Sequence, residues 1–281
     1  MSLKRVLVTG ASGLIGRLFF NHLNTQIPLK YDVYGLDITT DVSTRYELEK
    51  LLITENDKQR TAIPQDRFVQ CDVTDREKLH RLLDELKIDI VIHLAVSSPF
   101  ETDVDKLLRV NVEGTRNVFE APGVQSILYA SSVRTMLGYF IQEPYRSIEA
   151  HTLHDSIPIR KLTVANDPPI DGVFTPIEQA YFQSKLLGEQ IAHATRDKNT
   201  ICARFGWVNA RNEAAGDRWE CTVWCSHRDL CEFVDRALDA LVRKQSGTYF
   251  VCSDNYQLWL DMNDAKNDLG FVAKDGSKIK A

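Results

Sequence analysis

The stretch Val6-Leu7-Val8-Thr9-Gly10-Ala11-Ser12-Gly13-Leu14-Ile15-Gly16 decides the fold. Its apolar start predicts a buried strand, and the periodicity from Leu14 onward predicts a helix. Gly10, Gly13 and Gly16 stand between them in the spacing G-x-x-G-x-x-G. Such a turn lets backbone N–H groups approach an anion, and the helix dipole favours negative charge there. In this context the motif predicts a dinucleotide site; the alternative is an ordinary strand-to-helix turn.

A carboxylate follows at the position where a ribose would lie. Asp37 ends the second predicted strand, where it can accept hydrogen bonds from ribose hydroxyls and would repel a 2′-phosphate. The next residues, Ile38-Thr39-Thr40, bring no arginine to neutralise such a phosphate. The pattern therefore favours NAD over NADP, unless Asp37 is only a turn residue.

Short apolar runs alternate with longer amphipathic stretches along the chain. The runs are rich in Val, Ile and Leu without polar alternation, which is typical of parallel strands buried on both faces. We expect strands at 5–9, 32–36, 67–71, 90–94, 126–130, 201–205 and 248–251, and helices at 14–24, 76–86, 104–120, 176–196, 229–244 and 262–268. This alternation predicts an α/β fold with a doubly wound parallel sheet of the Rossmann type. Residues 1–205 are expected to form the NAD-binding domain, and 206–281 mainly a small substrate-binding region interleaved with the sheet.

Two stretches interrupt this rhythm. Residues 39–66 are long for a link between strands, and 46–57 could add a helix there. Residues 142–176 carry five prolines and little periodicity, which predicts a long surface excursion that could act as a lid.

Composition narrows the class of protein. The chain has 281 residues, of which 43% are hydrophobic and 26% charged, and a net charge of -5. These values give no general electrostatic case for nucleic acid or an anionic membrane, and no apolar run approaches the ~20 residues of a membrane span. The chain enters a strand at once, which we interpret as leaving no room for a signal peptide. The cysteines include no C-x-x-C pair, and Cys221, Cys225 and His227 match no common zinc spacing. We expect no metal, reduced thiols and a cytoplasmic protein.

A tyrosine and a lysine can share one helix face. Tyr181 and Lys185 stand at i and i+4 near the start of a predicted helix. A phenol has a reference pKa near ~10, and a positive charge ~4 Å away supplies about the 4 kcal/mol needed to ionise it at neutral pH. The pair is a candidate general base, although the pattern alone is weak. Ser131-Ser132 end the fifth strand at the carboxyl edge of the sheet, where a hydroxyl could hydrogen-bond a reacting oxygen.

Together these motifs resemble the extended short-chain dehydrogenase/reductase family, the NAD-dependent epimerase/dehydratase group, over most of the chain. The resemblance also rests on Cys71-Asp72-Val73-Thr74-Asp75, His93-Leu94-Ala95, Asn111-Val112-Glu113-Gly114-Thr115 and Tyr129-Ala130-Ser131-Ser132. It implies a catalytic set of Ser132, Tyr181 and Lys185, with Asn111 supporting the active-site helix. It implies that the cofactor is bound by Gly10, Ser12, Gly13, Leu14, Ile15, Gly16, Asp37, Asp72, Val73, Leu94, Ala95, Asn111, Tyr181 and Lys185. In this family the helices matching 104–120 and 176–196 pair across a homodimer; burial within one chain is the alternative.

The C-terminal third is most similar to uronate dehydrogenases and their sugar-oxidising relatives. The similarity rests on Arg204-Phe205-Gly206, Arg218, Trp224-Cys225-Ser226-His227-Arg228-Asp229 and Ser253-Asp254-Asn255. It implies an anionic sugar substrate that contacts Ser98, Ser132 and Arg218, with Arg218 holding a carboxylate.

The chain departs from this pattern near the substrate. Val133-Arg134 replace the usual Asn-His after Ser132, and Trp207 replaces a small polar residue. Ser132 and Tyr181 lie 49 positions apart, nearly twice the usual gap. Arg134 could be a second cation for a sugar phosphate, or a solvated arginine.

The sequence predicts an NAD-dependent oxidoreductase that transfers hydride between a sugar and nicotinamide. One alternative is a nucleotide-sugar epimerase or dehydratase that retains NAD, and another is a non-catalytic NAD-sensing protein. His93 is more typical of a hydrogen-bonded core histidine than of an acid–base group. The four tryptophans could stack on a sugar or cap the sheet: Trp207, Trp219, Trp224 and Trp259.

Overall fold

The computed structural model describes residues 3–40, 62–97, 100–166, 174–214 and 219–277. The possible helix at 46–57 lies outside these ranges. Within them, one parallel sheet has the strand order β3-β2-β1-β4-β5-β6-β7. Its strands are β1 Lys4–Thr9, β2 Tyr31–Asp37, β3 Phe68–Gln70, β4 Ile90–His93, β5 Ser126–Ser132, β6 Asn199–Phe205 and β7 Gly247–Val251. The predicted doubly wound sheet is confirmed, with the order reversing between β1 and β4, where such sheets open a ligand crevice at their carboxyl edge.

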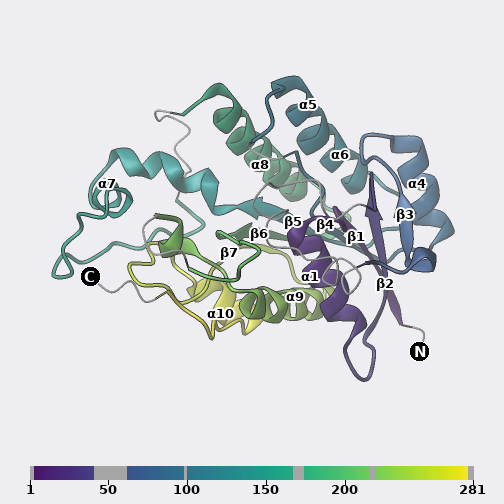
Figure 1. The fold of residues 1–281 in the computed structure, drawn as a ribbon. Coiled ribbons are helices and arrows are strands. Elements are labelled where there is room, and N and C mark those ends of the chain that lie inside the picture. Colours follow the sequence, from purple (N-terminus) through teal and green to yellow (C-terminus); the bar gives the residue numbers. More distant parts are fainter. Residues whose placement is uncertain (1–2, 41–61, 98–99, 167–173, 215–218, 278–281) are drawn as a thin grey trace.

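Helices cover both faces of the sheet (Figure 1). On one face lie α1 (Leu14–Asn24), α9 (His227–Val242) and α10 (Asn263–Leu269). On the other lie α4 (Arg76–Glu85), the α5 and α6 segments (Val104–Leu108 and Gly114–Phe119) and α8 (Pro176–Ala194). The α5 and α6 segments form one continuous helix, interrupted by the π-helical turn η2 at Arg109–Glu113.

The strands are buried because both faces of the sheet carry apolar layers. Val6, Val8 and Ile92 point to the α1 and α9 side, whereas Leu7 and Val91 point to the α4 and α6 side. All five are essentially inaccessible to water. Alternate strand residues face opposite sides, so the absence of polar alternation in the sequence has its physical cause here.

The predicted excursion is only partly a surface feature. The excursion begins directly after the 3-10 helix η3 (Val133–Ile141) and contains the short helix α7 (Tyr145–Glu149). The buried side chains of Tyr145, Ile148 and Leu162 join a third apolar cluster beyond the carboxyl edge of the sheet. Leu162 also donates its N–H to the Trp259 carbonyl at 2.9 Å. The excursion is thus anchored to the C-terminal segment, and its residues 167–173 lie outside the described part of the chain.

The C-terminal region shares the sheet with the N-terminal one. β7 pairs with β6 along five residues, and α9 packs on β5 and β6.

All six cysteines are free thiols. Among the described helices, none is long and apolar enough to cross a membrane. Within the described ranges, no group of His, Cys, Asp and Glu side chains is placed to bind a metal ion.

Candidate active site

The glycine turn is closed by backbone-to-backbone approaches that only glycine permits. Gly10 has φ +69°, and a Cβ there would lie 2.8 Å from the Ala95 nitrogen. A Cβ on Gly16 would lie 2.2 Å from the Gly10 carbonyl oxygen. Both distances are far below van der Waals contact, so the turn requires glycine at these positions. The turn therefore sits directly against the end of β4, at the crevice of the sheet.

The first turn of α1 is suited to an anion. Its N-cap is Gly13, which offers no capping side chain, and its first turn contains no acidic residue. The first N–H groups of a helix have no partner within the helix, and the dipole favours negative charge beside them. These residues fit a pyrophosphate, with Leu14 and Ile15 half-buried where the helix begins.

Asp37 lies beside this turn and is buried. Its carboxylate accepts hydrogen bonds from the N–H groups of Ser12 (3.0 Å) and Ile38 (2.7 Å). The Ser12 hydroxyl donates to the Thr39 carbonyl at 2.5 Å. Asp37 thus connects β2 to the glycine turn at the place where the sequence predicts a ribose.

The remaining predicted cofactor residues follow the neighbouring strands. Asp72 comes after β3, is exposed, and accepts the Thr74 N–H at 2.9 Å. Val73 is buried beside Gly114. Leu94 and Ala95 come after β4, and their N–H groups both donate to the Thr9 hydroxyl at 3.2 Å. The structure places all of them at the carboxyl edge of the sheet.

Tyr181 and Lys185 lie on the first turns of α8. The helix begins with a capping box between Thr175 and Glu178 and has a proline at its first position, features that fix its start. The Lys185 Nζ donates to the Ala130 carbonyl at 2.7 Å and lies 5.8 Å from the centre of the Tyr181 ring. The predicted pair therefore shares one face of α8 and faces the end of β5.

Lys185 is almost fully buried, and its pKa reflects this. Burial disfavours the ammonium and lowers the pKa of Lys185 to about 7, while the Glu189 carboxylate acts in the opposite direction. The Lys185 amine therefore gives up its proton more readily than a lysine in water.

Ser132 is the last residue of β5, two positions after the carbonyl that Lys185 binds. Its side chain is 9% exposed, and its Oγ accepts the Arg134 N–H at 3.2 Å. The hydroxyl thus keeps its own proton to donate. The ladder between β5 and β6 pairs Ser132 with Phe205 and holds this end of the strand in the sheet.

A buried ion pair that the sequence analysis did not assign lies behind Lys185. Arg204 on β6 donates from Nε and a terminal nitrogen to the two oxygens of Glu189 on α8, each at 2.8 Å. The Ser131 hydroxyl donates to the same carboxylate at 2.5 Å. The one available signal was that Glu189 stands four residues after Lys185, on the same helix face. The pair ties α8 to the strand end that carries Ser132.

Asn111 lies in the π-helical turn and joins two parts of the site. Its Oδ1 accepts the Ser97 N–H at 2.7 Å, and its Nδ2 donates to the Ser184 hydroxyl at 3.0 Å. That hydroxyl in turn donates to the Tyr181 carbonyl at 2.7 Å. The contacts agree with the predicted support of the active-site helix.

The predicted substrate residues are only partly brought together. Arg134 is half-buried, and its guanidinium lies 5.8 Å from the centre of the Trp219 ring. Trp207 is half-buried and pairs with Trp224 in a short parallel bridge. Trp224 and Trp259 are buried in the core, so these two do not stack on a sugar. Ser98 and Arg218 lie outside the described residues.

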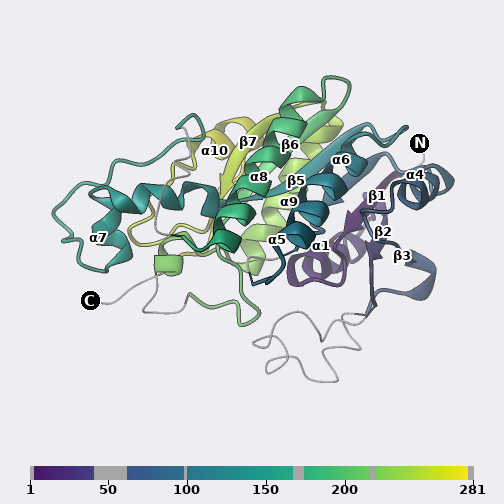
Figure 2. The same cartoon turned by 90° about the horizontal axis from the view of Figure 1, so that it is seen from above.

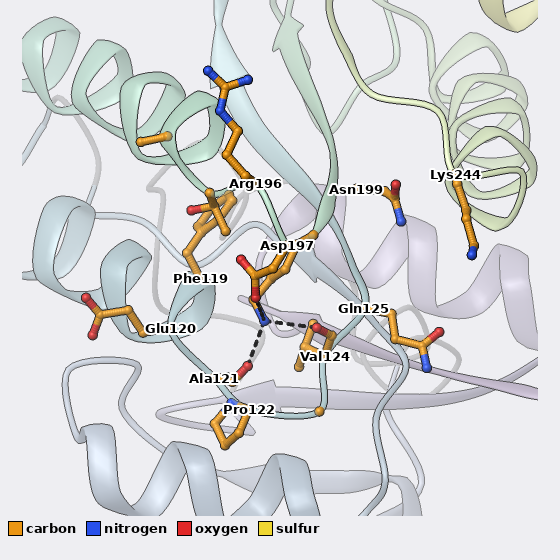
Figure 3. Close-up of a pocket in the computed structure, with 14 residues that line it drawn as sticks. Phe119, Glu120, Ala121, Pro122, Val124, Gln125, Arg196, Asp197, Asn199 and Lys244 are labelled. Carbon is orange, nitrogen blue, oxygen red and sulfur yellow. Dashed lines mark hydrogen bonds and ion pairs between the residues drawn. The ribbon is translucent and has the colours of Figure 1, made fainter.

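A separate hollow of about 870 Å³ lies at the opposite edge of the sheet (Figure 3). It is lined by the turns that enter β5 and β6, including Pro122 and Asp197. Its Lys198 donates to the carbonyl oxygens of Ala121 and Val124, each at 3.0 Å, and so closes one turn against the other. Ligands of open α/β sheets bind at the carboxyl edge, and the candidate site remains there.

Three comparisons place this geometry among known proteins. Residues 6–209 match the model of the NAD dependent epimerase/dehydratase family. Two proteins of Haloferax volcanii are each 24% identical: an NAD-dependent glucose-6-phosphate dehydrogenase, aligned over 97% of this chain and 94% of its own, and an L-arabinose 1-dehydrogenase (NAD(P)(+)), over 97% of both. The solved structure of a mutated uronate dehydrogenase has a TM-score of 0.66 and 23% identity, over 98% of this chain and 83% of its own. The likeness to the solved structure shows that the fold is shared.

Proposed function

The chain belongs to the NAD-dependent epimerase/dehydratase family, and on that premise we propose that it is a dehydrogenase that oxidises a hydroxyl of an anionic sugar. One observation carries the choice of substrate. A half-buried cation, Arg134, lies two residues after Ser132 and is held over an aromatic ring. An arginine beside the reacting hydroxyl would hold a carboxylate or phosphate with two parallel hydrogen bonds.

The residues of the site divide the chemistry between them. Tyr181 accepts the proton of the sugar hydroxyl, and Ser132 donates a hydrogen bond to the same oxygen. The positive charge of Lys185, 5.8 Å from the Tyr181 ring, stabilises the phenolate. Bound NAD supplies the acceptor for the hydride that leaves the carbon. The turn at Gly10 and Gly16, with Asp37, would hold that cofactor.

The anion on the sugar is a carboxylate or a phosphate. The relatives include a protein named for each kind of sugar, a uronate and glucose 6-phosphate. Arg134 departs from the uronate dehydrogenase pattern, and its added charge favours the doubly charged phosphate. Ser98 and Arg218 remain proposed substrate residues.

NADH formation tests the proposal, with uronates, neutral aldoses and aldose phosphates as the panel. Tyr181→Phe should lower kcat by about a thousandfold because the general base is lost. Arg134→Gln should raise KM for the anionic sugar by about 10- to 100-fold, the cost of a charge-assisted hydrogen bond. Neutral sugars should show no such change. Arg236→Gln, at an exposed arginine of α9, is the matched control. Absence of turnover across the panel, in protein that binds NAD, would refute the proposed dehydrogenase.

The alternatives give different results in the same assay. An epimerase or dehydratase would form product from a nucleotide sugar without net NADH and would retain NAD through purification. A non-catalytic NAD-sensing protein would bind NAD, and Tyr181→Phe would then change no activity.

We also propose that the protein is a cytoplasmic homodimer. The α5 and α6 segments run beside α8 on one face of the sheet (Figure 2), and Leu187 on α8 is 41% exposed. The free state of all six cysteines agrees with a reducing compartment. Light scattering should give twice the chain mass, and Leu187→Asp should give a monomer. A monomeric wild-type protein would refute the dimer.

A further inference from the structure

His93 lies between the strand end that leads into the glycine turn and the helix that carries Asn111. It ends β4, is 2% exposed, and has a partner for each ring nitrogen. Its Nδ1 lies 2.8 Å from the Thr9 hydroxyl at the end of β1, and its Nε2 lies 3.1 Å from the Thr115 hydroxyl on α6. The prediction of a hydrogen-bonded core histidine is confirmed, and its two partners lie in different parts of the site.

The other hydrogen bonds of the Thr9 hydroxyl determine whether the His93 Nδ1 donates or accepts. The Thr9 Oγ1 accepts the N–H groups of Leu94 and Ala95, and the Leu94 N–H is shared with the Thr9 carbonyl oxygen at 3.2 Å. The hydroxyl proton remains, and the His93 Nδ1 is its partner. The His93 Nδ1 must therefore be the acceptor of this bond. If Nδ1 carried a proton, three N–H groups would point at the Thr9 Oγ1, and the proton of the Thr9 hydroxyl would have no acceptor.

The remaining ring nitrogen then carries the proton. Burial, together with the nearby Lys185 charge, lowers the pKa of His93 to about 3, so the ring is neutral at physiological pH. A neutral ring with an accepting Nδ1 has its proton on Nε2. That N–H donates to Thr115, whose own hydroxyl donates to the Asn111 carbonyl at 2.6 Å.

The hydrogen-bond chain ends at the residue that positions the catalytic tyrosine. The Asn111 side chain holds the Ser97 backbone and the Ser184 hydroxyl, and Ser184 bonds to the Tyr181 carbonyl. The π-helical turn at Arg109–Glu113 displaces this part of the helix from regular geometry. The Thr115 hydroxyl bonds the carbonyl of Asn111 in that turn.

We propose that His93, held as its Nε2–H tautomer, is a positioning residue that connects the glycine turn after Thr9 to Asn111 through Thr115. His93 and Thr115 act through Asn111 and have no direct part in the reaction. The catalytic consequence rests on the proposed dehydrogenase function, whereas the tautomer and the positioning of Ser97 do not.

The tautomer is measured on the wild-type protein without substrate. In a long-range proton–nitrogen NMR spectrum at near-neutral pH, the His93 ring should show a protonated Nε2 and an unprotonated Nδ1 and should not titrate between pH 5 and 8. Its signals should be lost in His93→Asn and shifted in Thr115→Val. A protonated Nδ1, or an imidazolium, would overturn the inference.

Thr115→Val and Thr115→Ser test the link to Asn111. The valine keeps the shape and removes the hydroxyl, whereas the serine keeps the hydroxyl. Amide hydrogen exchange at Ser97 should be about tenfold faster in the valine variant and close to wild type in the serine variant, with NAD affinity within about twofold in both. With a turned-over sugar, kcat should follow the same pattern.

The two readouts separate this inference from the proposed function. Unchanged exchange at Ser97 in folded Thr115→Val, or equal loss in Thr115→Ser, would refute the positioning role. If no sugar in the panel is oxidised while the exchange pattern holds, the proposed reaction is wrong and the positioning role stands.

Discussion

The ion pair between Glu189 and Arg204 allows a direct measurement of what holds α8 on the sheet. The two side chains are 6% and 5% exposed. Glu189→Leu removes the acceptor of both arginine bonds and of the Ser131 hydroxyl. The guanidinium then keeps a weak contact to the Met136 sulfur at 3.4 Å and lies 5.5 Å from the Phe250 ring centre. Neither contact replaces a carboxylate.

The expected cost follows from burial. Removing one partner of a buried pair leaves an uncompensated charge and costs about 3–5 kcal/mol, a large share of a typical stability of about 5–15 kcal/mol. Arg204→Met should cost a similar amount for the same reason. The double variant leaves neither charge of the pair unpaired, so it should lose at least about 2 kcal/mol less than the two single losses together. Glu189→Gln keeps one acceptor and should cost about 1–3 kcal/mol.

Urea unfolding of the four variants gives the free energies, provided that the m-value stays constant. The surface pair of Arg236 and Glu232, one turn apart on α9 with side chains 47% and 24% exposed, is the control, and Arg236→Met should cost less than about 0.5 kcal/mol. Glu189→Leu losing no more stability than this control, or a double-mutant coupling near zero, would refute the argument. Either result would mean that water reaches the pair.

Three further predictions concern the cofactor turn and two titrating groups. Gly16→Ala should weaken NAD binding at least a hundredfold by calorimetry, since its Cβ would lie 2.2 Å from the Gly10 oxygen; unchanged binding would contradict the turn geometry. Burial lowers the pKa of Lys185 from 10.5 to about 7, so the unfolded chain binds more protons between these values, and the slope of stability against pH there should be more positive in wild type than in Lys185→Met; equal slopes in urea unfolding would count against the burial. The hydrogen bond with Asp235 raises the pKa of His22 from 6.5 to about 10, so its stabilisation is complete below pH 6.5 and lost as pH rises to 10; because both side chains are partly exposed, His22→Gln should remove only about 1 kcal/mol of that pH dependence in thermal unfolding.

The sheet could be predicted from sequence because its signal is local. The strand predicted at 90–94 corresponds to β4 (Ile90–His93), and the helix predicted at 14–24 corresponds to α1 (Leu14–Asn24). A strand buried on both faces must be apolar throughout. The close backbone approaches at Gly10 and Gly16 require glycine, so the turn is visible in the sequence as a glycine motif. The Glu189–Arg204 pair carries no such local signal, because its existence depends on which faces of α8 and β6 meet.

The excursion shows the opposite limit. Its prolines and weak periodicity predicted a surface loop, yet Tyr145, Ile148 and Leu162 are buried. Their burial comes from contact with residues about a hundred positions away, including Trp259 and Leu260. Irregular backbone gives no period to detect, so apolar residues in such a segment cannot be assigned to a core from spacing.

The same contrast separates the cofactor half of the site from the substrate half. The turn from Gly10 to Gly16 would hold the cofactor through backbone atoms, and the close backbone approaches at Gly10 and Gly16 leave no room for a side chain there. The side chains proposed for the substrate half come from distant segments: Arg134 in η3, with Trp219 of the 3-10 turn η4 (Trp219–Val223) beside it, and Trp207 after β6. None of these residues lies in a strand of the sheet, so we expect their replacement to leave the strands in place. Substrate preference in this chain should therefore change with Arg134 while NAD affinity does not, and a variant in which both change together would show that the two halves are mechanically coupled.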